Sequence, residues 1–257
     1  MTHVNPPKTL KDSIHVLAVG AFGERTADIL KQLLPNVIAT LPRQDNSTLP
    51  AMWPVARINV LIAWRPVPRL YRVFDTLSHH WKTPFISATL EAPHLRVGPV
   101  VVPGLGACYD CYEKRVLQHS TRPAEHTAAQ KFYDDNPAAG PLGYLIPFTE
   151  MAAIRTTQII RQLDEAPEAV AGKVWQLNAI SRQIVHSEVV GMHGCMRCGL
   201  KRSEAARGFE SLQSELAYLF DSNLHDESSI GELDYAPPLI KKARHWHVRP
   251  LVAPAGK

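Results

Sequence analysis

The sequence predicts an α/β protein that combines a mostly parallel sheet, an added antiparallel β pair and a structural four-cysteine zinc site. Up to about residue 90, apolar runs alternate with amphipathic helical segments, which is typical of a parallel sheet flanked by helices. The four cysteines of the chain form two CxxC pairs, Cys108 with Cys111 and Cys195 with Cys198. Because the pairs lie far apart in the sequence, a shared metal ion would tie two distant segments together.

The N-terminal segment predicts a strand, a glycine turn, a helix and a second strand. Residues 14–19, "IHVLAV", form an apolar run typical of a strand, and Gly20 and Gly23 follow at the turn. Apolar residues then recur at helical spacing and lead to a strand at residues 37–41. This succession is the opening of a Rossmann-like unit.

The middle of the chain continues this alternation and then changes character. "RINVLIAW" predicts a third buried strand at residues 57–64, and a helix at 70–80 and a fourth strand at 83–90 follow. Residues 119–143 are polar and interrupted by prolines and glycines, which predicts a mobile crossover loop. A further helix is expected at residues 148–163, where apolar residues recur at helical spacing.

Two β-rich runs and a tail complete the chain. "KVWQLNAIS" and "QIVHSEVVG" predict an antiparallel pair that leads into the second cysteine turn. The predicted domains are a zinc-containing domain at residues 1–200 and a C-terminal extension at residues 201–257. The extension is expected to be helical at about residues 203–220 and irregular beyond them.

The two CxxC pairs have the composition of a zinc site. A CxxC pair on a tight turn places two sulfur atoms along one edge of a tetrahedron, and two such turns close a four-thiolate site without an open position for water. Such a metal is structural. Two alternatives stay open, namely redox-active CxxC pairs and simple buried thiols. His193 could replace one ligand, although four thiolates already fill the coordination shell.

Charge and hydropathy narrow the function classes. The formal net charge is +4 and the isoelectric point is about 8.9, but Lys and Arg are spread along the whole chain. This distribution is compatible with an acidic peptide partner and gives little reason to expect nucleic-acid binding. No stretch has the roughly 18 consecutive apolar residues of a membrane span, and the N-terminus lacks the apolar core of a signal peptide. A cytoplasmic location is therefore expected, where thiols stay reduced.

The order of these motifs resembles a known superfamily. A glycine turn, then "VGPVVVPGLGACYDCYEKR", a helix, a β pair and "GCMRCG" resemble the E1-like (ThiF/MoeB-type) proteins over about residues 14–199. Within that superfamily the sequence is most similar to the cyclodehydratase C proteins, the partners of YcaO enzymes in azole- and azoline-forming peptide biosynthesis, as in microcin B17 synthetase. The resemblance implies a Rossmann-like E1-type fold and a zinc tetrad on all four cysteines.

The nucleotide-binding features of adenylating E1-like proteins are not kept. Those proteins carry a GxGxxG-type turn, whereas "GAFGER" keeps Gly20 and Gly23 and has Phe22 at the place of the middle glycine. The ribose-binding acid is missing from "IATLPR", and the third strand ends at Trp64 where an Asp is usual. The resemblance therefore implies that the fold persists without adenylate chemistry, so that no catalytic residue and no cofactor-binding residue is assigned.

The favoured prediction is a non-catalytic scaffold subunit of a ribosomal-peptide heterocyclase complex. It would dock a YcaO cyclodehydratase that uses ATP, help to present the precursor peptide and form a homodimer within a larger complex. An FMN-dependent dehydrogenase is a further partner that the resemblance implies. About 13 residues precede the first strand, so the winged-helix leader-binding module of many C proteins is expected on another chain or on a composite surface.

Two other functions remain open at this stage. A divergent ATP-dependent adenylating enzyme would activate the C-terminus of a peptide or carrier protein, with Arg25, Arg65 or Arg69 offsetting the charge of the triphosphate. A zinc-stabilised interaction protein outside peptide biosynthesis is the third reading.

Overall fold

The computed structural model describes residues 12–43, 48–141 and 143–199, which belong to one compact unit, Met1–Ala205. The predicted extension at residues 201–257, with its helix at about 203–220, lies outside the described residues. Among the described residues, no helix has both the length and the apolar character needed to cross a membrane.

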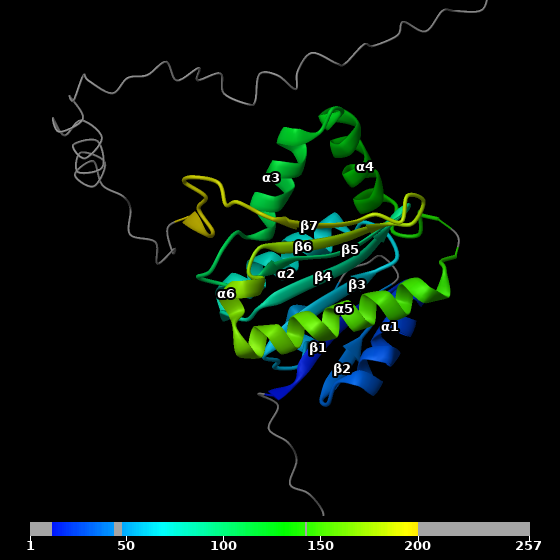
Figure 1. The fold of residues 1–257 in the computed structure, drawn as a ribbon, viewed down its shortest axis with the longest axis vertical. Coiled ribbons are helices and arrows are strands. Elements are labelled where there is room, and N and C mark those ends of the chain that lie inside the picture. Colours follow the sequence, from blue (N-terminus) through cyan, green and yellow to red (C-terminus); the bar gives the residue numbers. More distant parts are fainter. Residues whose placement is uncertain (1–11, 44–47, 142, 200–257) are drawn as a thin grey trace, which may run out of the picture. The chain divides into compact units, whose positions relative to one another are not determined.

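A seven-stranded sheet forms the centre of this unit (Figure 1). Its spatial order is β2-β1-β3-β4-β5-β6-β7. The strands are β1 (Ile14–Val19), β2 (Val37–Thr40), β3 (Ile58–Ala63), β4 (Phe85–Glu91), β5 (His94–Val101), β6 (Lys173–Asn178) and β7 (Ile184–Glu188). The first four are parallel to one another, and each later strand is antiparallel to the one before it, so β6 again points in the direction of β4. Most strands therefore share one direction, as predicted.

Helices cover both faces of the sheet. They are α1 (Gly20–Leu33), α2 (Pro68–Trp81), α3 (Tyr109–His119), α4 (Pro123–Asp135), α5 (Ile146–Glu165) and the short α6 (Pro167–Val170), together with a 3-10 turn, η2 (Pro50–Met52). Figure 1 shows α1 and α5 side by side on one face, where they share a core with β1, β3 and β5. On the other face α2 and the start of α3 pack over a second core. Because β1 and β3 are covered on both faces, all of their residues are buried, which explains their uninterrupted apolar runs.

The predicted α/β class is confirmed, with a mostly parallel sheet and an added antiparallel pair. The predicted strands at residues 14–19, 37–41, 57–64 and 83–90 correspond to β1 to β4, and the predicted pair corresponds to β6 and β7. The strand β5 was not predicted. Its sequence, "HLRVGPVV", contains a glycine and a proline, and Gly98 coincides with an irregularity in the pairing with β4.

The segment at residues 119–143 is not a loop throughout, and this part of the prediction is wrong. Residues Pro123–Asp135 form the helix α4. Pro123, one of the prolines that indicated a loop, stands in the first turn of α4, where no backbone N–H is needed and the fixed φ favours a helix. After it, "AEHTAAQKFYDD" consists largely of good helix formers.

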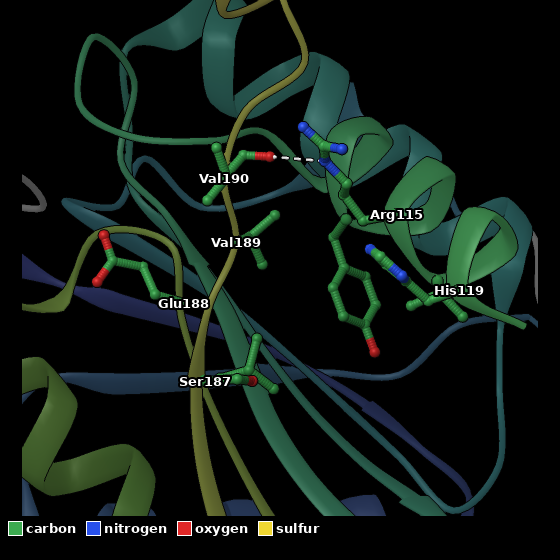
Figure 2. Close-up of a pocket in the computed structure, with 9 residues that line it drawn as sticks. Arg115, His119, Ser187, Glu188, Val189 and Val190 are labelled. Carbon is green, nitrogen blue, oxygen red and sulfur yellow. Dashed lines mark hydrogen bonds between the residues drawn. The ribbon is translucent and has the colours of Figure 1, made fainter. Parts of the chain in front are cut away.

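An open groove separates α3 from the edge strand β7. Figure 2 shows this groove, which has a volume of about 480 Å³. The groove continues to Val189 and Val190, on the segment that leads from β7 into the second cysteine turn.

Candidate functional site

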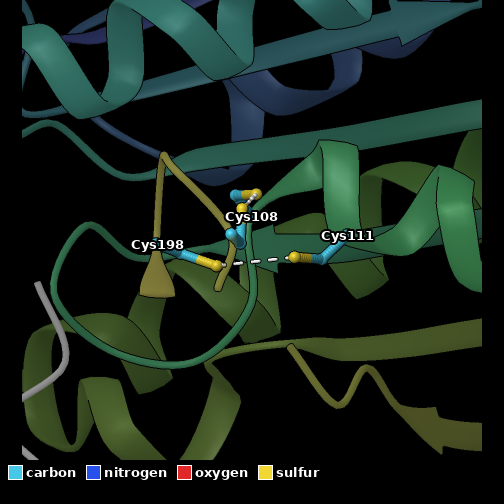
Figure 3. A group of neighbouring side chains, drawn as sticks. Cys108, Cys111 and Cys198 are labelled. Carbon is cyan, nitrogen blue, oxygen red and sulfur yellow. Dashed lines mark hydrogen bonds between the residues drawn. The ribbon is translucent and has the colours of Figure 1, made fainter. Parts of the chain in front are cut away.

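The four cysteines come together at one end of the sheet. Cys108 is the N-terminal cap residue of α3 and Cys111 lies in the first turn of that helix, whereas Cys195 and Cys198 lie in a turn beyond β7 (Figure 3). All four side chains are buried and no disulfide joins them. The structure therefore brings together two segments that are 87 residues apart, as the CxxC spacing predicted.

The geometry of the cluster fits a tetrahedral metal ion. The Sγ atoms of Cys108 and Cys195 are 3.7 Å apart, and those of Cys111 and Cys198 are 3.5 Å apart. All four Sγ atoms lie within 4.8 Å of one another. With Zn–S bonds of about 2.3 Å, a regular tetrahedron has S···S edges of about 3.8 Å. Four sulfur donors at this spacing are a set that zinc accepts well.

The surroundings shift the pKa values of three of the cysteine thiols in different directions. Burial raises the pKa of Cys111 to about 11, although the backbone N–H of Met192 donates a hydrogen bond to its sulfur. Burial also raises the pKa of Cys108. At Cys195 burial acts in the same direction, but backbone N–H groups of the second turn, together with hydrogen bonds from the Cys111 and Cys198 thiols, lower the pKa to about 6. A metal ion must therefore displace protons from the first pair, while Cys195 is already disposed to be a thiolate.

A buried carboxylate on α2 connects the two cysteine turns. Asp75 is fully buried and accepts hydrogen bonds from the backbone N–H groups of Tyr109 (2.9 Å) and Asp110 (3.3 Å), the two residues inside the first CxxC pair. It also forms an ion pair with Arg197, which lies inside the second pair. Sequence reasoning missed Asp75. The available signal was an acid on the buried face of an amphipathic helix, beside Phe74.

The alternatives for the cysteines can be compared with this geometry. His193 is exposed and does not belong to the cluster of ligand atoms. All four Sγ atoms lie within 4.8 Å of one another, and the contacts of 3.5 and 3.7 Å join different CxxC turns, which favours one shared metal site over two separate redox pairs.

The second candidate region is the edge of the sheet where the parallel strands end. In open α/β sheets this edge holds the ligand, and the N-terminus of the first helix receives its phosphates. Here α1 begins at Gly20, directly after β1, and the Trp64 side chain lies against that glycine. A Cβ atom at Gly20 would stand 2.5 Å from the Trp64 ring. The indole therefore occupies space beside the residue that would approach a phosphate.

The chain after α4 also covers this edge. A Cβ atom at Gly140 would stand 2.6 Å from the benzene end of the Trp64 indole, whereas Gly20 lies against its pyrrole end, so glycines of two different segments contact this side chain. The Tyr144 hydroxyl donates a hydrogen bond of 3.3 Å to the carbonyl of Ala21, in the first turn of α1. Trp64 and Tyr144 thus both contact the first turn of α1.

The arginines proposed for a triphosphate are placed differently. The Arg65 side chain is fully buried, and its guanidinium donates to carbonyl groups at the end of α4, including that of Pro137 at 2.7 Å. Arg65 therefore caps a helix of the protein itself. Arg25 and Arg69 are exposed. The backbone N–H of Arg69 donates a hydrogen bond of 2.8 Å to the carboxylate of Asp134.

Comparisons with known proteins identify the fold. No protein-family model matches the chain, and no curated protein matches it. Among solved structures, the heterocyclase TruD is similar to it, with a TM-score of 0.53, 16% identity and 74% of this chain covered. The chain shares the fold of TruD. MccB of Escherichia coli has a TM-score of 0.51 with 14% identity over 77% of the chain, and the E. coli microcin synthetase McbBCD complex has 0.52 with 12% over 74%.

The likeness to these proteins confirms the fold that the motif order predicted. The chain spans 28% of the length of TruD, 67% of MccB and 71% of the matching chain of the McbBCD complex. It therefore corresponds to one part of the heterocyclase TruD and to a larger share of MccB and of the McbBCD chain.

Proposed function

We propose that the chain is a non-catalytic, E1-like scaffold subunit of a ribosomal-peptide heterocyclase complex, which forms azoline or azole rings. In this role it docks a YcaO cyclodehydratase, which uses the ATP, and helps to present the precursor peptide. An FMN-dependent dehydrogenase is a further partner where azolines are oxidised. We expect the chain to act in the cytoplasm as a homodimer within a larger complex.

Two of the structures that share the fold support the peptide-modifying part of this proposal. One is a heterocyclase in complex with substrate and cofactor, and another is a microcin synthetase complex. A subunit without catalytic groups can still accelerate such a reaction, because holding the peptide beside a second subunit replaces a bimolecular encounter by an intramolecular one.

The observation that carries the non-catalytic part is the position of Trp64. Its pyrrole end lies against Gly20 at the start of α1, and its benzene end lies against Gly140. The triphosphate of an adenylating enzyme would need this space and the N–H groups behind it. Zinc in the cysteine cluster, held by Cys108, Cys111, Cys195 and Cys198, would supply structural stability alone.

A divergent adenylating enzyme remains the second candidate. One structure that shares the fold is MccB of E. coli with AMPCPP, an ATP analogue, and MccA, at a TM-score of 0.50. The fold is therefore compatible with nucleotide binding, and the two functions differ at the edge of the sheet near Trp64.

Titration of the purified full-length chain with Mg·ATP distinguishes the two candidates. We expect no saturable binding at micromolar ATP, because the Trp64 ring occupies the space beside Gly20 at the start of α1. MccB is a suitable positive control, since its structure includes AMPCPP. Micromolar binding together with pyrophosphate release would reject the scaffold function and establish the adenylating one.

A further inference from the structure

The strand β7 is an edge of the sheet formed by the described residues, and every residue in it is exposed. The register with β6 determines which backbone groups of β7 form hydrogen bonds within the sheet. Val189 donates to Gly172 at 2.9 Å, and Gln183 accepts from Asn178 at 2.9 Å. Backbone groups alternate in direction along an antiparallel strand, so those of Ile184, His186 and Glu188 point away from β6. Among the described residues, no backbone hydrogen bond uses these outward groups, so they can pair with a further strand.

The edge strand β7 carries one acidic residue, Glu188, and its other side chains give little protection against the pairing of a second chain. Natural edge strands usually carry lysine, proline or a bulge, which prevent the pairing of a second chain. Here the edge presents Ile184 and Val185, each 52% exposed, and Val190, 67% exposed, lies just beyond its end. An edge with exposed β-branched residues favours the addition of a strand.

The groove beside β7 adds a chemical preference. Its walls are apolar at Val116, Val174 and Val189. Figure 2 shows Arg115 and His119 on α3 facing the segment at residues 187–190 across the groove, and Arg115 Nε donates to the Val190 carbonyl at 3.2 Å. The one carboxylate of the lining is already compensated, because Glu188 pairs with Lys173 at 2.5 Å. The groove thus combines apolar side chains with the positive charge of Arg115.

We propose that the groove between α3 and β7 binds an extended peptide segment that alternates acidic and apolar residues and adds to β7 as a further strand. The peptide backbone pairs with the outward groups of Ile184, His186 and Glu188, and an acidic side chain faces Arg115. This inference rests on the proposed function, which supplies a peptide to be presented. It deepens that function by locating the surface on which the peptide is held.

Binding of three designed peptides to the full-length protein tests the proposal. The first is a capped hexapeptide of alternating Glu and Val with a neutral fluorescent label, the second has Lys in place of Glu, and the third is the first with N-methyl groups on alternate amides. Fluorescence anisotropy at low salt should show that the Glu/Val peptide binds at least tenfold more tightly than the other two. Equal binding of the Glu/Val and Lys/Val peptides would overturn the proposal.

Substitutions in β7 and α3 locate the binding. His186→Pro removes an outward N–H and keeps the pairing with β6, so it should weaken binding tenfold or more, whereas His186→Ala should leave it unchanged. Arg115→Glu should reverse the preference in favour of the Lys/Val peptide. Arg25→Glu, at an exposed site of α1, is the matched charge control and should leave the preference for the Glu/Val peptide unchanged. Equal effects of the two His186 variants, or of the two arginine variants, would overturn the proposal.

Amide hydrogen exchange identifies any other occupant of the edge. The His186 amide should exchange rapidly in the free protein and become protected when the Glu/Val peptide is added. Protection of the His186 amide before peptide addition would overturn the proposal. Protection that depends on protein concentration would indicate a second copy of the chain at this edge. Protection that does not depend on concentration would indicate residues 200–257. Because these measurements need no YcaO enzyme, their failure is distinguishable from failure of the proposed function.

Discussion

Cys198→Ser is expected to abolish stoichiometric zinc binding and to lower the thermal unfolding midpoint by about 10 °C or more. The cluster joins the start of α3 to a turn beyond β7, and Cys198 lies 3.5 Å from Cys111 across that junction. Loss of one thiolate leaves an incomplete tetrahedron and three buried thiols. Because metal binding to a folded site contributes directly to the free energy of folding, loss of the ion lowers stability.

Metal analysis by mass spectrometry and thermal unfolding check this expectation. The wild-type protein should contain about one zinc per chain, as for a single four-thiolate site. Met196→Ala is the matched control, because Met196 lies in the same turn and is 83% exposed. Two results would show that the cysteines do not form a zinc site. One is wild-type protein that contains no zinc when it is purified without metal stripping. The other is a Cys198→Ser variant that binds zinc as well as Met196→Ala does.

Asp75→Ala is expected to lower the free energy of unfolding by about 2–4 kcal/mol and to accelerate zinc release. The substitution leaves two backbone N–H groups of the first cysteine turn and the Arg197 guanidinium without their acceptor. Breaking a buried ion pair by removing one partner costs about 3–5 kcal/mol, and the lower range applies here because the Arg197 side chain is 32% exposed. Asp75→Asn should have an intermediate effect, since it keeps an oxygen acceptor without the charge.

Urea unfolding gives the stability change, and a chromophoric chelator gives the rate of zinc release. Asp134→Asn is the matched control, because Asp134 also pairs with an arginine, Arg72, and also accepts a backbone N–H, but it lies on α4 away from the cysteines. Only the Asp75 variants should release zinc faster than the wild type. Equal release rates for Asp75→Ala and Asp134→Asn would show that Asp75 does not position the cysteine turns.

The cysteine cluster could be predicted because its information is local. Two residues between paired cysteines, on turns, already fix most of the geometry of a metal edge, and four such ligands have few ways to combine. The strands β1 and β3 could also be predicted from the sequence, since burial on both faces leaves continuous apolar runs. In contrast, β5 carries a glycine and a proline that local patterns assign to turns.

The parts that could not be predicted depend on contacts between distant residues. Asp75 precedes the first cysteine turn by more than thirty residues, and only the packing of α2 against α3 brings it there. Trp64 was recognised as a departure from the usual Asp, but nothing in the sequence shows that its ring stands between Gly20 and Gly140. Similarly, Arg65 looked available for a phosphate until the structure placed it at the end of α4.

Affinity co-purification of the tagged full-length chain from its native cells tests the scaffold function most directly. We expect mass spectrometry to identify a YcaO-type protein in near-equal amount, and the recovered pair to remove water from the precursor peptide in an ATP-dependent reaction. Recovery of the chain alone, or with a small carrier protein that ends in glycine, would contradict the scaffold function.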